Sequence, residues 1–164
     1  EAARMAAIDP VTGEISRGFI ARNQKKLAEA ERHYRQAAAL DATGRRGDVE
    51  LSSFLAGEKR WGEARGVFES RLERNAGDTF AAYMLARVLQ AQGTEAQRAI
   101  GLFDQYLAAP PVEGGPTPAD AWFRKAQALA ALGRRAEAVA ALETTLTLAP
   151  GHAAAARELK KLKG

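Results

Sequence analysis

Few residues of this chain have a type and a spacing that could support catalysis or metal binding. Its two histidines, His33 and His152, stand far apart in the sequence, and neither belongs to a recognisable metal-ligand motif. Cysteine is absent, which excludes disulfides and cysteine-ligated zinc. No glycine-rich phosphate loop or dinucleotide turn occurs, and no serine stands in a nucleophile-elbow pattern. We therefore expect no enzymatic activity, no metal and no cofactor, and we expect His33 to be an ordinary exposed or packed side chain.

The pattern of charge favours neither a nucleic-acid partner nor a membrane. The formal net charge is +4 and the pI is near 9.6, but the 24 basic and 20 acidic residues are interspersed rather than grouped. A nucleic-acid surface would need a basic stripe with aromatic stacking residues along one face. No apolar run is long enough to span a bilayer. We expect neither nucleic-acid binding nor membrane insertion.

Four pairs of residues with the form small-x-x-x-large recur along the chain. They are Ala30 with Tyr34, Ala64 with Phe68, Ala99 with Phe103, and Ala138 with Leu142. The alanines are separated by steps of 34, 35 and 39 residues. A period near 34 residues indicates repeated helix–turn–helix units, and such units stack because none can bury its apolar face alone. The sequence therefore predicts an all-α fold of stacked helix pairs.

The clearest unit lies near the C-terminus. Residues 119–132 contain no Gly or Pro and place their apolar residues at helical spacing. Gly133 suits a tight turn that needs left-handed or unrestrained backbone, a second helix follows over about 135–148, and Pro150 cannot continue it. Residues 152–163 predict a capping helix with a basic end.

These units resemble the tetratricopeptide repeat family. In the last unit the resemblance is carried by Trp122, Leu129, Gly133, Ala138, Leu142 and Pro150. The unit from Thr79 is similar through Leu85, Ala86, Leu89, Gly93, Ala99, Phe103 and Pro110-Pro111, and the unit from Arg45 through Leu51, Ser52, Leu55, Trp61, Ala64, Phe68 and Leu72. The first, from about Val11, keeps Gly18, Leu27, Ala30, Tyr34 and Ala37. Lys125-Ala126 replaces the Leu-Gly pair of the motif, and Ala76 replaces a closing Pro. The resemblance implies a right-handed α-solenoid of helix–turn–helix repeats with a C-terminal capping helix.

We predict one domain over residues 1–164, divided into successive units. Residues 1–10 are the tail of a preceding helix or a frayed arm; the units that follow are an atypical repeat over about 11–44, repeats over 45–78 and 79–113, a loop over 114–118, a repeat over 119–152, and a capping helix over 152–164. The whole Pro/Gly-rich stretch Pro110 to Pro118 is expected to be a surface loop. It is either a rim that contacts a partner or a tolerated insertion, and we favour the insertion.

The resemblance implies a binding groove lined by the first helix of each repeat. Carried onto this sequence residue by residue, the groove positions include Phe19, Val49, Ser53, Phe80, Tyr83, Met84, Arg87, Gln90, Phe123, Arg124 and Gln127. Large apolar residues at such positions are expected to be exposed and to mark an interaction site. The alternative is a frame error of one position, which would place Tyr83 or Phe123 in the core.

We predict a scaffold or adaptor that binds a peptide or helix segment of a partner protein. The groove residues favour apolar anchors and an acidic group for Arg87 or Arg124. A two-carboxylate clamp, as in chaperone-tail-binding members of the family, is not expected, because only Arg124 matches its pattern and Asp120 would repel a carboxylate. The alternative is a class II type III secretion-type chaperone that holds unfolded substrates; a nucleic-acid binder or an enzyme platform is disfavoured. The Ala/Arg/Gly-rich composition suggests a bacterial source, and we favour a soluble monomer in the envelope or periplasm over the cytoplasm.

Overall fold

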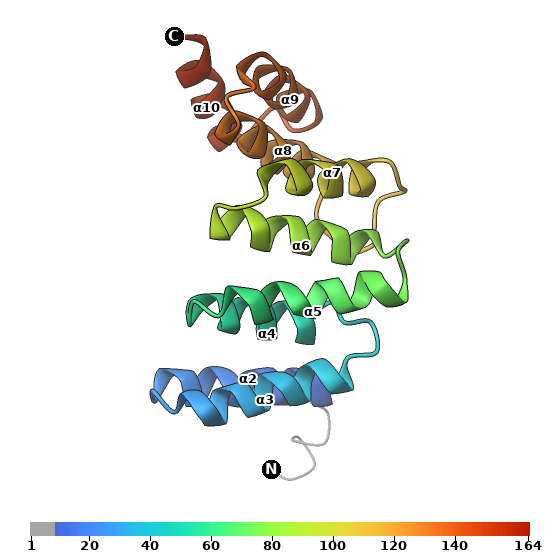
Figure 1. The fold of residues 1–164 in the computed structure, drawn as a ribbon, viewed down its shortest axis with the longest axis vertical. Coiled ribbons are helices and arrows are strands. Elements are labelled where there is room, and N and C mark those ends of the chain that lie inside the picture. The colour runs from blue at the N-terminus through green and yellow to red at the C-terminus, as the bar shows by residue number, and fades with distance from the viewer. Residues whose placement is uncertain (1–8) are drawn as a thin grey trace. The chain divides into compact units, whose positions relative to one another are not determined.

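The structure, a computed structural model, describes residues 9–164, and every regular element in this range is an α-helix (Figure 1). The helices are α2 (Pro10–Asn23), α3 (Leu27–Leu40), α4 (Gly47–Gly57), α5 (Trp61–Arg74), α6 (Thr79–Gln92), α7 (Ala96–Leu107), α8 (Pro118–Ala131), α9 (Arg135–Leu148) and α10 (Ala153–Lys163). The all-α prediction is confirmed, and the helices predicted over 119–132, 135–148 and 152–163 begin and end within one residue of α8, α9 and α10. Residues 1–8, part of the predicted N-terminal tail, lie outside the described residues.

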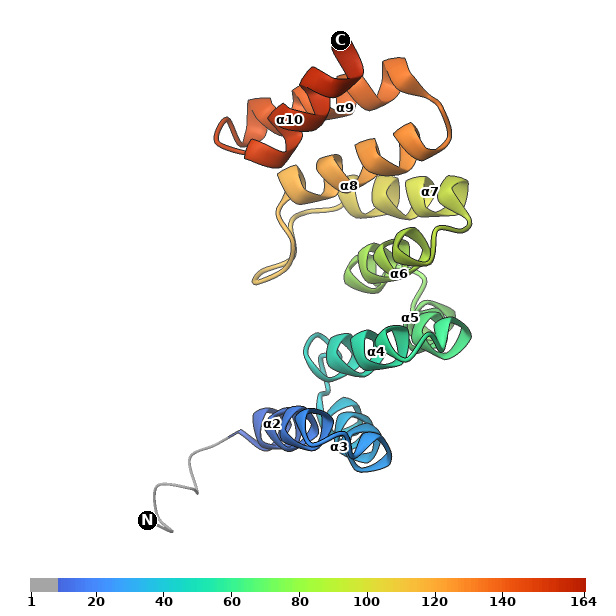
Figure 2. The ribbon, with the colours of Figure 1, turned by 90° about the vertical axis from the view of Figure 1, so that its left-hand side faces the viewer.

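The chain forms two compact units that meet between Phe68 and Glu69, within α5. Unit 1 contains α2, α3, α4 and the first part of α5; unit 2 contains the rest of α5 and α6 to α10. Figures 1 and 2 show that within each unit consecutive helices run in opposite directions. The division of the chain into repeats stays a prediction. The observed helix pairs are compatible with it.

In unit 1, small residues let α2 and α3 approach closely. Ala30, Tyr34 and Ala37 form the buried stripe of α3. Gly18 of α2 faces the Tyr34 ring, and a Cβ at this glycine would lie 2.8 Å from the ring's Cε1. Tyr34 also contacts Phe54 of α4, with 5.3 Å between the ring centroids. Tyr34, the large member of the first small-large pair, therefore joins these three helices.

Asp41 fixes the connection from α3 to α4. Its carboxylate accepts hydrogen bonds from the Thr43 hydroxyl at 2.6 Å and from the backbone N–H groups of Arg46 and Gly47 at 2.7 and 3.0 Å. Burial acts to raise the pKa of Asp41, but these hydrogen bonds outweigh burial and lower it to about 2. Orphan N–H groups at the start of α4 are thereby satisfied by a side chain outside the helix.

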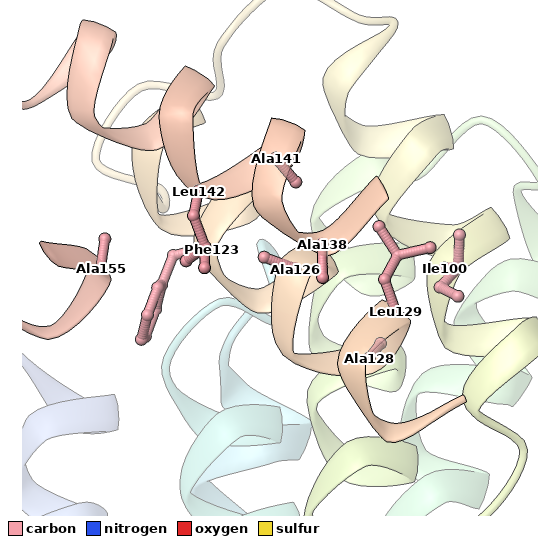
Figure 3. Packing of buried hydrophobic residues seen from close by; sticks show 9 residues of the cluster. All are labelled: Ile100, Phe123, Ala126, Ala128, Leu129, Ala138, Ala141, Leu142 and Ala155. Atoms are coloured by element: carbon pink, nitrogen blue, oxygen red, sulfur yellow. The ribbon is translucent and has the colours of Figure 1, made fainter. Parts of the chain in front are cut away.

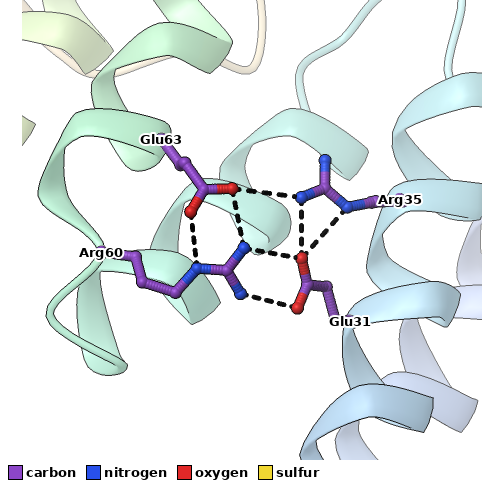
Figure 4. A network of polar contacts seen from close by, with 4 residues as sticks. All are labelled: Glu31, Arg35, Arg60 and Glu63. Atoms are coloured by element: carbon purple, nitrogen blue, oxygen red, sulfur yellow. Dashed lines mark hydrogen bonds and ion pairs between the residues drawn. The ribbon is translucent and has the colours of Figure 1, made fainter.

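An ion-pair network joins the outer surfaces of α3 and α5 in unit 1 (Figure 4). The Arg60 guanidinium donates to both Glu31 oxygens at 2.6 and 3.0 Å and to Glu63 at 2.7 Å, and Arg35 bridges the two carboxylates. Hydrogen bonds from Arg60 lower the pKa of Glu31 to about 2, although partial burial opposes them. These charges satisfy one another, so the network is structural.

In unit 2, α6, α8 and the capping helix α10 each begin at a side-chain cap. Asp78 accepts from the Ala81 N–H, Thr117 forms a reciprocal capping box with Asp120, and His152 accepts from the Ala155 N–H through Nδ1. The α8–α9 turn contains Gly133 with a φ of 71°, which confirms the left-handed backbone predicted there.

The core near the C-terminus is built from α7 to α10 (Figure 3). Its buried members are Ile100, Phe123, Ala126, Ala128, Leu129, Ala138, Ala141, Leu142 and Ala155, and Trp122, Leu146, Leu159 and Leu162 cover it partly. Leu159 and Leu162 of α10, the predicted capping helix, thus pack on the last helix pair.

The connection between α7 and α8 is anchored by Tyr106. Its hydroxyl donates a hydrogen bond to the Pro116 carbonyl at 2.5 Å, and its ring lies 5.0 Å from the Tyr83 ring. Pro110 and Pro111 are exposed, as predicted for a surface loop. The loop is therefore tied to the core of unit 2 at one end.

Candidate functional site

The apolar residues predicted to line the groove in unit 2 are buried. Phe80, Tyr83, Met84 and Phe123 are only 8%, 3%, 6% and 9% exposed. The expectation that these side chains form an exposed apolar patch is wrong.

The contacts of Tyr83 explain why the predicted groove residues of α6 are buried. Its ring packs against Phe103 and Tyr106 of α7, with centroid distances of 5.6 and 5.0 Å. Helix α6 contacts α7 on one side and α8 on another, so most of its circumference is covered. The sequence of α6 itself indicates this burial, because its residues are apolar almost all round and such a helix is normally buried.

Phe123 is covered from α10. Its ring lies 4.6 Å from the His152 imidazole, between centroids, and it belongs to the buried cluster with Ala155. The capping helix therefore closes over a residue that the sequence placed in the groove. His152 itself was not among the predicted site residues.

The polar residues predicted for the groove do gather on one surface of unit 2. On α6, Tyr83, Arg87 and Gln90 follow one helical stripe; on α8, Asp120, Arg124 and Gln127 follow another. We call the five of these residues that reach solvent the α6–α8 surface, namely Arg87, Gln90, Asp120, Arg124 and Gln127; Tyr83 lies buried beneath it. Gln90 donates from Nε2 to the Arg124 carbonyl at 3.0 Å, which joins the two stripes directly.

The α6–α8 surface is ordered by further polar contacts. Gln127 Nε2 donates to Glu158 of α10 at 2.8 Å, and Arg124 donates to Gln127 Oε1 over 3.4 Å. Arg87 is exposed and lies 3.9 Å from Met84 Sδ, whereas Arg124 is half-buried. Burial raises the pKa of Tyr83, and the nearby positive charges of Arg87 and Arg124 act in the opposite direction.

The remaining predicted site residues belong to unit 1. Phe19 of α2 is 58% exposed, Ser53 of α4 is exposed, and Val49 of α4 is half-buried. Helices α2 and α4 contact each other within this unit. Phe19 is thus the one predicted aromatic groove residue that is open to solvent among the described residues.

Outside this surface, His33 is engaged with two carboxylates. His33 Nδ1 lies 2.7 Å from Glu14 Oε2, and its Nε2 is 4.0 Å from Glu29, so it is packed between α2 and α3. Within residues 9–164, no three potential metal-ligating side chains converge. In the same range, no helix combines the length and apolar character needed to cross a membrane.

Comparison with known proteins identifies the repeat. Residues 119–152, which contain α8 and α9, match the sequence model of the tetratricopeptide repeat family. A search of curated protein sequences returns no match.

Several solved structures resemble this chain in fold. MamA 41-end from Desulfovibrio magneticus RS-1 has a TM-score of 0.69 at 16% identity, over 94% of this chain and 84% of that one. YrrB, described as a TPR protein with an unusual peptide-binding site, has a TM-score of 0.65 at 20% identity, over 92% and 74%. A putative kinesin light chain of Podospora anserina with nearly identical TPR-like repeats has a TM-score of 0.69 at 20% identity, over 94% and 86%. Residues 119–152 therefore contain a tetratricopeptide repeat, and the chain has the fold of the tetratricopeptide-repeat structures that it resembles.

Proposed function

We propose that this protein is a scaffold that binds a peptide or helix segment of a partner protein on the α6–α8 surface. The observation that carries the proposal is the set of polar side chains on two first helices that are joined by the Gln90–Arg124 hydrogen bond. A surface that is already ordered loses little conformational entropy when a ligand binds. The likeness to YrrB, whose title names a peptide-binding site, supports the same function class.

An adaptor role is favoured over that of a chaperone for unfolded substrates. Holding unfolded segments would require a broad exposed apolar surface, but Phe80, Tyr83, Met84 and Phe123 are buried under the α6–α8 surface. Recognition there would rest on charge and hydrogen bonding. A role in assembling a bacterial complex in the cell envelope is part of this proposal, and likeness to MamA and YrrB is what supports a bacterial setting.

Site-specific photo-crosslinking tests the location of the binding surface. A photoreactive amino acid is introduced at Ala91, an exposed residue one turn after Arg87 on α6, or at Ala140, an exposed residue of the second helix α9. Each protein is then mixed with a labelled peptide selected from a random library for binding to the unmodified chain. We expect crosslinks at position 91 and few at position 140. A selection that enriches no peptide, or equal crosslinking at both positions, would contradict the proposal.

A further inference from the structure

Helix α2 of unit 1 exposes two neighbouring large apolar residues. The helix contacts α3, and its buried residues are Val11, Gly18 and Ala21. Phe19 and Ile20 project away from this stripe and are 58% and 55% exposed, the highest exposed fractions of any large apolar residue among residues 9–164. The other exposed large apolar residues of that range stand singly in the sequence. We call the exposed residues in the second half of α2 the α2 face: Ser16, Arg17, Phe19, Ile20, Arg22 and Asn23.

Positive charges surround these two apolar residues. Arg17 and Arg22 lie on the α2 face itself, and Lys25 and Lys26 follow in the turn to α3; all four are exposed. The stretch from residue 15 to residue 28 contains these four cations and no carboxylate. The charges of the whole chain are interspersed, so this local excess of one sign distinguishes the α2 face from the rest of the sequence.

The carboxylates of α2 and its cap are engaged elsewhere. Glu14, the only carboxylate within α2, lies 2.7 Å from His33 Nδ1 on α3 and also pairs with Arg17. Asp9, the cap of α2, pairs with Arg46 at 2.7 Å at the opposite end of the helix from the turn. Neither carboxylate belongs to the α2 face.

The remaining cations are not neutralised. Lys26 is 3.8 Å from Glu29, a long and exposed pair. Arg22 and Lys25 form no ion pair with any of residues 9–164. Even with Arg17 and Lys26 paired, the α2 face and the turn after it therefore keep a positive charge.

From this arrangement we propose that the α2 face docks on the surface of a membrane that contains anionic phospholipids. Phe19 and Ile20 enter the headgroup layer, and the four cations contact lipid phosphates and carboxylates around them. Apolar side chains bordered by Lys and Arg on one helix face are typical of helices that lie in the interface of a bilayer, and each cation near an anionic leaflet adds to the attraction. The contact is peripheral and needs no spanning helix. It is independent of the peptide binding proposed for unit 2.

A membrane suits the α2 face better than a folded protein partner does. Stable protein interfaces bury about 800 Å² per partner around a closely packed apolar centre. Here only two apolar side chains are exposed, among Ser16, Asn23 and the cations. A fluid bilayer needs no complementary shape, and a modest apolar anchor combined with a basic cluster supports reversible binding to it.

Site-specific fluorescence tests the location of the contact. The chain has no cysteine, so Ser16→Cys, one turn before Phe19 and Ile20, and Ala140→Cys, exposed on α9, each carry a single nitrobenzoxadiazole label. Each labelled protein is mixed with vesicles of phosphatidylcholine alone or of phosphatidylcholine and phosphatidylserine. We expect a blue shift of the emission only for the label at position 16 and only with the mixed vesicles. Equal shifts at both positions or with both kinds of vesicle would overturn the proposal. No shift at all would also overturn it and would leave the α2 face to an acidic protein partner.

A first pair of variants tests the apolar anchor by co-sedimentation with the mixed vesicles. Phe19→Ser with Ile20→Ser removes the anchor, and Leu132→Ser with Leu148→Ser removes two apolar side chains that are 44% and 53% exposed in unit 2. We expect the first variant to bind roughly tenfold or more weakly and the second to bind like the wild type. Equal binding by the two variants would overturn the role of the α2 face.

A second pair separates the basic cluster from general charge effects. Lys25→Gln with Lys26→Gln removes two charges beside the α2 face, and Lys160→Gln with Lys161→Gln removes two from exposed positions on α10. Each cation near an anionic leaflet strengthens binding several-fold, so we expect the first variant to bind the mixed vesicles roughly tenfold or more weakly. The second should bind like the wild type. Equal weakening in both variants would show attraction by net charge alone and would overturn the proposal.

Discussion

Tyr83 is a core residue as well as a neighbour of the α6–α8 surface, and a substitution there affects folding first. The ring is 3% exposed and contacts two aromatic rings of α7. Removing such a ring costs about 3–5 kcal/mol, so we expect Tyr83→Ala to lower the free energy of unfolding by that amount in chemical denaturation. Tyr83→Phe keeps the ring and serves as the control, with a loss of about 1 kcal/mol. A Tyr83→Ala variant that unfolds like the wild type would contradict the burial of this residue.

Gly18 is required by packing rather than by backbone conformation. A Cβ there would lie 2.8 Å from the Tyr34 ring, which is itself confined by Phe54. We expect Gly18→Ala to destabilise the protein by about 1–3 kcal/mol because the contact is overpacked.

The control for this substitution is Gly66→Ala in α5, also within unit 1. A Cβ at Gly66 meets nothing within 4 Å, so the gain in helix propensity should stabilise the protein by up to about 1 kcal/mol. Urea denaturation of the two variants measures both effects. Similar behaviour of the two variants would show that α2 and α3 are not in close contact at Gly18.

Asp41 makes the stability of the fold dependent on pH in the acid range. Its pKa falls from an ordinary 3.8 to about 2 on folding, so its stabilising contribution is complete above about pH 4 and is lost as the pH falls toward 2. A shift of this size corresponds to about 2 kcal/mol. We expect Asp41→Asn to be less stable than the wild type at pH 7 and to show a flatter decline in unfolding free energy between pH 4 and pH 2. Parallel pH profiles of the two proteins would contradict this role.

At the scale of helices, sequence periodicity predicted the elements well and their exposed faces poorly. Small-large pairs such as Ala30 with Tyr34 lie among the buried residues of α3, α5, α7 and α9, as the recurrence of these pairs predicted. In helix α6, apolar residues occupy most positions, and nine of them are buried. Deciding whether Phe80 and Tyr83 point to solvent therefore required knowing which helices cover α6.

Tyr106 explains how the extra residues between α7 and α8 are accommodated. Its hydroxyl bonds to the Pro116 carbonyl, which ties the loop to the core. We expect Tyr106→Phe to lose about 1 kcal/mol of stability and to speed hydrogen exchange at the N–H groups of the loop residues Val112 to Gly115. Exchange in α9 serves as the internal control and should not change locally. Unaltered loop exchange in the variant would show that the hydrogen bond does not order the loop.

For the whole molecule, the fold was predicted from the sequence more accurately than the binding surface was. The family resemblance named the helices that present the α6–α8 surface, and its polar members Arg87, Gln90, Arg124 and Gln127 do lie there. The contribution of α10 could not be foreseen, because the contacts of His152 with Phe123 and of Glu158 with Gln127 join residues about 30 apart in sequence. Nor does a sequence reveal which arginines lack a partner; that follows only once every carboxylate has been placed.

The central proposal is that the α6–α8 surface of unit 2 binds a peptide segment of a partner protein, with Arg87 and Arg124 among the contacting residues. Isothermal titration calorimetry with a peptide selected from a random library tests it most directly, when the wild type is compared with Arg87→Gln/Arg124→Gln and with Arg135→Gln/Arg157→Gln. Thermal unfolding of each variant ensures that all three proteins are folded. We predict that the first variant binds the peptide at least roughly tenfold more weakly, that the second binds like the wild type, and that replacing the acidic residues of the peptide by their amides removes the difference. Equal affinity of all three proteins for the acidic peptide would contradict the account.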